Sequence, residues 1–74
     1  MDTLNVSFAI AAKSEDDAAW TILPNTLTPI EEEVTAQLTR LADAGDSETK
    51  YTVVKIEESG VTAVGEIRWG IREL

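Results

Sequence analysis

Cysteine and histidine are both absent from the sequence, and with them go the side chains on which much enzyme catalysis and metal binding depends. Without cysteine the chain has no thiol nucleophile and no disulfide, which fits a reducing compartment such as the cytoplasm. Without histidine the chain lacks the usual general base at neutral pH, so its serines have no histidine to activate them. The ligands of a structural zinc site are missing as well. We therefore expect no enzyme activity, no cofactor and no metal.

Long apolar runs are also absent, which excludes a membrane-spanning helix of about 20 residues. The chain begins MDTLNVSFAIAAK, with an acid before a short apolar stretch, whereas a secretory signal carries basic residues there. With 74 residues, 43% of them hydrophobic, the chain has room for one thin core and is too apolar to be disordered. We expect residues 1–74 to form a single cytoplasmic domain and a complete, very short gene product.

Basic residues are scarce. Six Lys and Arg stand against fourteen Asp and Glu, so the formal net charge is -8. Such a surface repels nucleic acids and anionic membranes and attracts basic protein surfaces. We therefore expect a protein partner with a basic surface, and neither direct nucleic-acid binding nor membrane binding.

Two segments before residue 24 have the alternation of a strand. In residues 4–12, Leu4, Val6, Phe8 and Ile10 alternate with smaller or polar residues, which predicts one apolar face. Residues 19–23 carry Trp20 and Ile22 two positions apart, which predicts a second strand. The competing interpretation of this region is one helical turn that begins at Ser14.

A helix is predicted over residues 29–43. Thr28-Pro29-Ile30-Glu31 has the sequence of a capping box, in which the Thr28 hydroxyl accepts the N–H of Glu31 and the Glu31 side chain accepts the N–H of Thr28. An apolar stripe of helical spacing follows, and Gly45 then provides a natural end. The stripe consists of Ile30, Val34, Leu38 and Leu41.

Two further strands are predicted at residues 50–57 and 61–71, joined by a tight turn at Ser59-Gly60 into an antiparallel hairpin. Gly65 and Gly70 mark a bulge or a close backbone approach. The predicted fold is α+β, an antiparallel four-stranded sheet of order β-β-α-β-β with one helix packed on one face.

The other face of this sheet is expected to carry an apolar strip. Either Tyr51 and Val53 or Thr52 and Val54 face away from the helix, and with Val64 such a pair forms a strip that suits dimerisation or partner docking. The alternative is an ordinary, lightly apolar solvent face. Trp20 and Trp69 are expected in the core or on the sheet, and an exposed tryptophan is a plausible anchor for a partner.

The predicted chain direction places the acids at the two ends of the domain, about 20 Å apart along the helix. We name two groups. The first acidic group comprises Glu15, Asp16, Asp17, Asp43, Asp46 and Glu48, and the second comprises Glu31, Glu32, Glu33, Glu57 and Glu58. Both are candidate partner-binding residues.

Each group also has a simpler explanation. Carboxylates in the first turn of a helix are stabilised by its dipole, which explains Glu31, Glu32 and Glu33. A solvated loop is the simpler explanation for Glu15, Asp16 and Asp17, although three adjacent like charges repel one another. The helix dipole also disfavours Asp43 in the last turn. These two departures make the first acidic group the preferred contact. Asp43-x-x-Asp46-x-Glu48 offers oxygen ligands for Mg²⁺ or Ca²⁺ but lacks the spacing of an EF-hand loop.

A family resemblance rests on the small size of the chain, on its lack of Cys and His, and on two acid runs, Ser14-Glu15-Asp16-Asp17 and Glu31-Glu32-Glu33. The chain resembles the small acidic proteins that phages and mobile elements encode against host defence, including anti-CRISPR and anti-restriction proteins. The resemblance covers the whole chain in composition only, since these families share no motif. It implies an inhibitor that mimics DNA and blocks the DNA-binding site of a CRISPR surveillance complex in the host cytoplasm.

Two other functions fit the same sequence. One is a small phage structural or assembly module that self-associates through an edge strand such as 4–12. The other is an antitoxin-like or adaptor domain that neutralises a basic protein other than a DNA binder. A monomer or weak homodimer is expected for the inhibitor.

Overall fold

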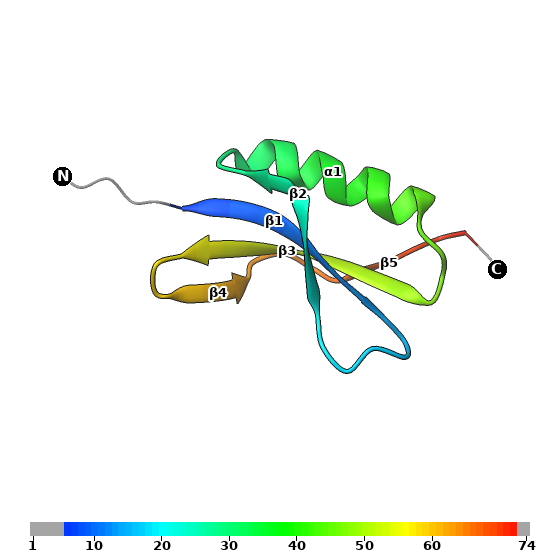
Figure 1. Ribbon diagram of the computed structural model, residues 1–74. Helices are drawn as coiled ribbons and strands as arrows, with labels where there is room; N and C mark the ends of the chain where they lie inside the picture. Colours follow the sequence, from blue (N-terminus) through cyan, green and yellow to red (C-terminus); the bar gives the residue numbers. More distant parts are fainter. Residues whose placement is uncertain (1–5, 73–74) are drawn as a thin grey trace.

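The computed structural model describes residues 6–72 as one helix laid across one face of an antiparallel sheet, which confirms the predicted α+β class (Figure 1). The sheet has the order β2-β1-β3-β4, and a short fifth strand, β5, pairs with the other half of β3. The elements are β1 (Ser7–Ser14), β2 (Thr21–Thr28), α1 (Glu31–Ala44), β3 (Thr49–Glu57), β4 (Gly60–Ala63) and β5 (Arg68–Trp69). Leu4 and Asn5 of the predicted strand 4–12 lie outside the described residues.

The pairing of β1 with β3 decides which side chains face the helix. Ile10 lies opposite Val53, and both pack beneath the helix with Val34 and Leu38. Because side chains alternate along a strand, the neighbouring pair Ala11 and Thr52 faces the opposite side. The helix-side core is small, since Ile10 and Val34 are its largest fully buried side chains among the described residues.

The predicted start of the helix is wrong. The helix begins at Glu31 with Ile30 as its N-cap, and no side chain caps it. Thr28 still belongs to β2, where it pairs with Phe8, and its hydroxyl does not bond to the N–H of Glu31. Its hydroxyl instead accepts the N–H of Ile30 at 3.2 Å and donates to a carboxylate oxygen of Glu33 at 3.1 Å.

The apolar stripe is shifted accordingly. Ile30 is 48% exposed, whereas Ala42 is buried beside Val34 and Leu38. The predicted end is off by one residue, since the helix ends at Ala44 with Gly45 as its C-cap. Gly45 has ordinary extended backbone angles, so its small size matters here for close packing against Tyr51 and Leu41 rather than for a left-handed turn.

The second strand exists, and the competing helical turn at Ser14 is wrong. Strand β2 begins two residues later than predicted, at Thr21, and runs further, through Pro24 to Thr28. Its register against β1 shifts between Phe8 and Ile10, because proline cannot donate a ladder hydrogen bond. The buried Thr26 hydroxyl fills the gap: it accepts the N–H of Ile10 at 2.8 Å and donates to the carbonyl of Leu23 at 2.6 Å.

The predicted continuous strand 61–71 is broken into β4 and β5. Between them the chain leaves β3, and the Thr52 hydroxyl holds the detour by donating to the carbonyls of Gly65 and Glu66 at 3.3 and 3.1 Å. At the other end of β4, Gly60 has a φ of 142°, a conformation that other residues rarely adopt. Val64 follows Ala63, the partner of Val54, so it faces the helix side beside Leu38 and Val53, and the predicted apolar strip does not include it.

The chain beyond β5 is tied to the end of the helix. Gly70 donates to Thr49, Ile71 to Ala42 and Arg72 to Gly45, at 2.8, 3.1 and 3.0 Å. Gly70 is buried, and a Cβ there would collide with the backbone of Gly45 and Asp46, which confirms the predicted close approach. Within residues 6–72, no helix has the length and apolarity needed to cross a bilayer.

Candidate functional site

The first acidic group is drawn from segments that are far apart in the sequence. Glu15, Asp16 and Asp17 follow β1, whereas Asp46 and Glu48 lie between α1 and β3. The end of β1 pairs with the start of β3, and the N–H of Glu15 donates to the carbonyl of Glu48 at 3.0 Å. Asp43 lies exposed in the last turn of the same helix. The structure thus brings the loop after β1 and the loop before β3 together at one end of the sheet (Figure 1).

Two carboxylates of this group have structural roles. Asp17 accepts the N–H of Ser14 at 3.1 Å, and this backbone hydrogen bond is the main reason that the pKa of Asp17 lies below its ordinary value of 3.8. Lys13 adds a smaller effect in the same direction. Asp46 accepts from the N–H of Glu48 at 2.9 Å and from the Thr49 hydroxyl at 3.0 Å. Both acids therefore fix the loops in which they lie.

The carboxylates of Glu15, Asp16, Asp43 and Glu48 are different. Their residues are exposed, and none of them forms a side-chain hydrogen bond or ion pair with another residue in the range 6–72. These are the charges that a partner could contact without breaking the fold.

The second acidic group lies at the other end of the helix and sheet (Figure 1). Glu31, Glu32 and Glu33 occupy the exposed first turn of α1, where the helix dipole stabilises them. Glu33 also accepts from Thr28, and Glu57 lies 3.7 Å from the ammonium of Lys55. Glu58 is in the exposed turn between β3 and β4. The helix dipole, the Thr28 hydrogen bond and the Lys55 ion pair therefore explain the positions of most acids in this group.

Neither group assembles a metal site from the described residues. No set of three or more Asp and Glu side chains within residues 6–72 is arranged to hold a metal ion. The possible oxygen ligands Asp43, Asp46 and Glu48 do not converge, since Asp46 bonds within its own loop.

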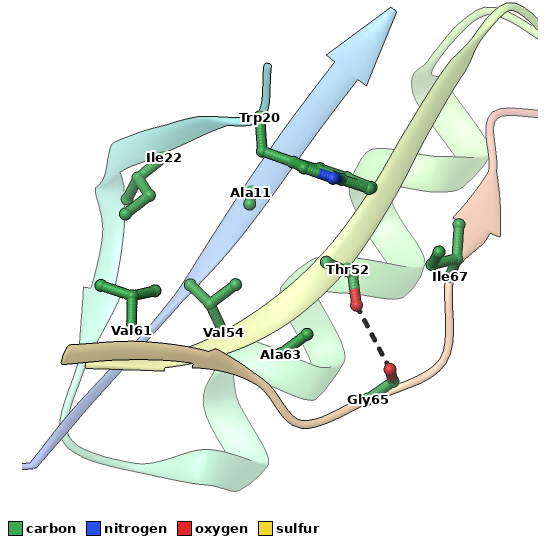
Figure 2. A pocket seen from close by; sticks show the side chains of 9 residues that line it. All are labelled: Ala11, Trp20, Ile22, Thr52, Val54, Val61, Ala63, Gly65 and Ile67. Carbon is green, nitrogen blue, oxygen red and sulfur yellow. Dashed lines mark hydrogen bonds between the residues drawn. The ribbon is translucent and has the colours of Figure 1, made fainter. Parts of the chain in front are cut away.

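A feature that the sequence predicted only in outline is a groove on the sheet face opposite the helix (Figure 2). Small residues and β3 side chains form its floor, and large apolar side chains form its rim. The floor includes Ala11, Thr52, Val54, Ala63 and Gly65, and the rim consists of Trp20, Ile22, Val61 and Ile67. Its volume is about 450 Å³.

The rim of the groove is accessible to a partner. Val61 and Ile67 are 54% and 53% exposed, and Trp20 is 38% exposed. Figure 2 shows Trp20 reaching across one end of the groove while Ile22 and Val61 border the other. Tyr51 and Val53 pack against the helix-side core, so Thr52 and Val54 are the pair that faces away from it.

Lys50 lies between the two tryptophans. Its ammonium is 5.6 Å from the centre of the Trp20 ring and 5.5 Å from that of the Trp69 ring, within the range of cation–π attraction. Trp69 pairs directly with Lys50 across β5 and β3, and it is half exposed. The tryptophans therefore lie on the sheet face opposite the helix, which we call the open face, and not in the helix-side core.

The sequence held a partial signal for the groove. Within the predicted strand 61–71, the alternation of Val61, Ala63, Gly65 and Ile67 predicts that they share a face, but only the β1–β3 register places Ala11 beneath it. Comparisons of the chain with protein-family models, with curated proteins and with solved structures found no match.

Proposed function

We propose that this protein is a non-catalytic binding domain that docks its first acidic group onto a basic surface of another protein. The observation that carries the proposal is the meeting of two distant acidic loops at one end of the sheet, joined by the Glu15–Glu48 backbone hydrogen bond. Four of the six carboxylates there have no side-chain partner among the described residues, so their charge is available to a neighbour.

A surface that normally holds nucleic acid is the basic surface we favour. The helix of 14 residues separates the two acidic groups by about 20 Å, so the domain presents negative charge at two widely spaced points. A protein channel that binds the phosphate backbone presents Lys and Arg over a similar span. By its resemblance to anti-defence proteins, the chain is proposed to inhibit a nucleic-acid-binding complex of the host cytoplasm, a CRISPR surveillance complex in the first instance, by charge mimicry.

The test measures binding of labelled target DNA by a purified, guide-loaded CRISPR surveillance complex in the presence of this protein. We expect the wild type to prevent DNA binding, with at least a tenfold loss of potency when NaCl rises from 0.1 to 0.5 M, because the contact is between charged surfaces. The variant Glu15→Lys, Asp16→Lys, Glu48→Lys should lose inhibition while retaining its circular dichroism spectrum. Asp17 and Asp46 are left unchanged because they hold the loops.

The matched control carries the same change of charge at the second acidic group: Glu31→Lys, Glu32→Lys, Glu58→Lys. Potency that falls only in the first variant supports a contact made by the first acidic group, and an equal fall in both variants indicates that the two groups contribute together. Inhibition that is unaffected by the first variant and by 0.5 M salt contradicts the proposal.

A further inference from the structure

The groove described above lies beside the first acidic group, and this proximity is the basis of the inference. Asp17 and Trp20 are three residues apart on the loop that leads into β2. Three residues span at most about 11 Å. A single segment of a partner that spans two or three helical turns therefore reaches from the groove to the acids.

The shape of the groove calls for an inserted apolar ridge. Its floor is low because Ala11, Ala63 and Gly65 carry little or no side chain, while Trp20 and Ile67 rise at its rim. A volume of about 450 Å³ lies within the usual range of binding pockets. A second copy packed face to face presents the same hollow and not a ridge, and it also brings another charge of -8.

The charges around the groove indicate which sign of charge a bound partner segment carries beside its apolar ridge. The open-face positions of β1 and β3 carry two charged side chains, Lys13 and Lys50. Lys50 already lies between two indole rings, and Lys13 lies close enough to Asp17 to lower its pKa. The exposed carboxylates of Glu15, Asp16 and Glu48 have no such partner among the described residues, so the free charge at this end is negative.

We infer that the groove and the first acidic group together bind a basic amphipathic segment of the partner protein, with its apolar side chains in the groove and its Lys or Arg on the acids. The inference rests on the proposed function and specifies the partner: a basic surface with apolar residues beside its charges, and not a purely electrostatic one. Hydrophobic anchors then provide affinity, and the charges provide orientation and a fast encounter.

The experiment pans a displayed library of random 14-residue peptides against the immobilised full-length protein. We expect enriched peptides that combine several Leu, Ile, Phe or Met with Lys or Arg, and the best of these is then synthesised. Its affinity should fall at least tenfold for Val61→Ser, Ile67→Ser, two uncharged changes at exposed positions that leave the core intact. A matched control, Val64→Ser, changes an exposed valine on the helix side and should leave the affinity unchanged.

Four outcomes overturn the inference: no enrichment, enriched peptides rich in Asp or Glu, equal affinity for the wild type and the groove variant, or a dimer in light scattering that Ile67→Ser dissociates. The first-group charge variant separates this failure from that of the proposed function. If the first-group charge variant abolishes inhibition of DNA binding while the groove variant inhibits normally, the proposed acidic contact is supported and the groove contact is contradicted.

Discussion

At the scale of single residues, the Thr26 hydroxyl forms hydrogen bonds where the backbone pairing of β2 with β1 is interrupted. Pro24 interrupts the pairing of β2 with β1, and the Thr26 hydroxyl then accepts the buried N–H of Ile10 and donates to Leu23. The change Thr26→Val keeps the shape of the side chain but leaves the Ile10 N–H unpaired. We expect a loss of about 1–3 kcal/mol in the free energy of unfolding, measured by urea denaturation.

Thr35 supplies the control for this prediction. Its hydroxyl also donates to a carbonyl, that of Glu31, but in an exposed position where water replaces the lost bond. Thr35→Val should change stability by less than about 0.5 kcal/mol. An equal effect of both substitutions would show that burial of the Ile10 N–H is not what makes Thr26 important.

At the scale of elements, the segment after β5 fastens the helix to the sheet. Its backbone bonds to Ala42, Gly45 and Thr49, and Gly70 allows it to lie against the Gly45–Asp46 backbone. We expect Gly70→Ala to destabilise the fold by about 1–3 kcal/mol through overpacking. Hydrogen exchange at the amides of Ile71 and Arg72 should accelerate.

The matched variant is Gly65→Ala. A Cβ at Gly65 meets the Val53 side chain at 3.5 Å, an ordinary contact, so stability should stay within about 0.5 kcal/mol of the wild type. Destabilisation of similar size at both glycines would contradict the role given to the close approach at Gly70.

Elements that depend on local pattern could be predicted from the sequence, and elements that depend on distant partners could not. The helix was predicted within two residues because Val34 and Leu38 recur at helical spacing. Its cap was wrong because pairing with Phe8 keeps Thr28 in β2. The break between β4 and β5 was missed because Thr52, far away in sequence, holds the detour at Gly65 and Glu66.

At the scale of the whole molecule, the same distinction applies to the candidate site. The direction of successive antiparallel elements was enough to place the two acidic groups at opposite ends. The sequence could not show that Asp17 and Asp46 serve their own loops, since this depends on the hydrogen bonds of Ser14 and Thr49. Nor could it show the floor of the groove, because this depends on the register of Ala11 against Thr52.

The net charge of -8 also predicts how the stability of the molecule responds to salt. In 10 mM NaCl the screening length is about 30 Å, so carboxylates repel one another across the domain, whereas in 0.5 M NaCl only near neighbours interact. We expect the melting temperature to rise by about 4–8 °C over this range, which corresponds to about 1 kcal/mol for a chain of this size. Differential scanning calorimetry measures the change.

The variant Glu15→Gln, Asp16→Asn, Glu48→Gln isolates the part of this repulsion that comes from the first acidic group. Because these exposed carboxylates have no side-chain partner within residues 6–72, their neutralisation should raise the melting temperature in 10 mM NaCl and reduce the gain on adding salt. Ion pairs would produce the opposite pattern, with a variant that melts lower and a wild type that loses stability in salt. Unbalanced charge that costs stability at this end of the sheet is charge that a basic partner would neutralise on binding.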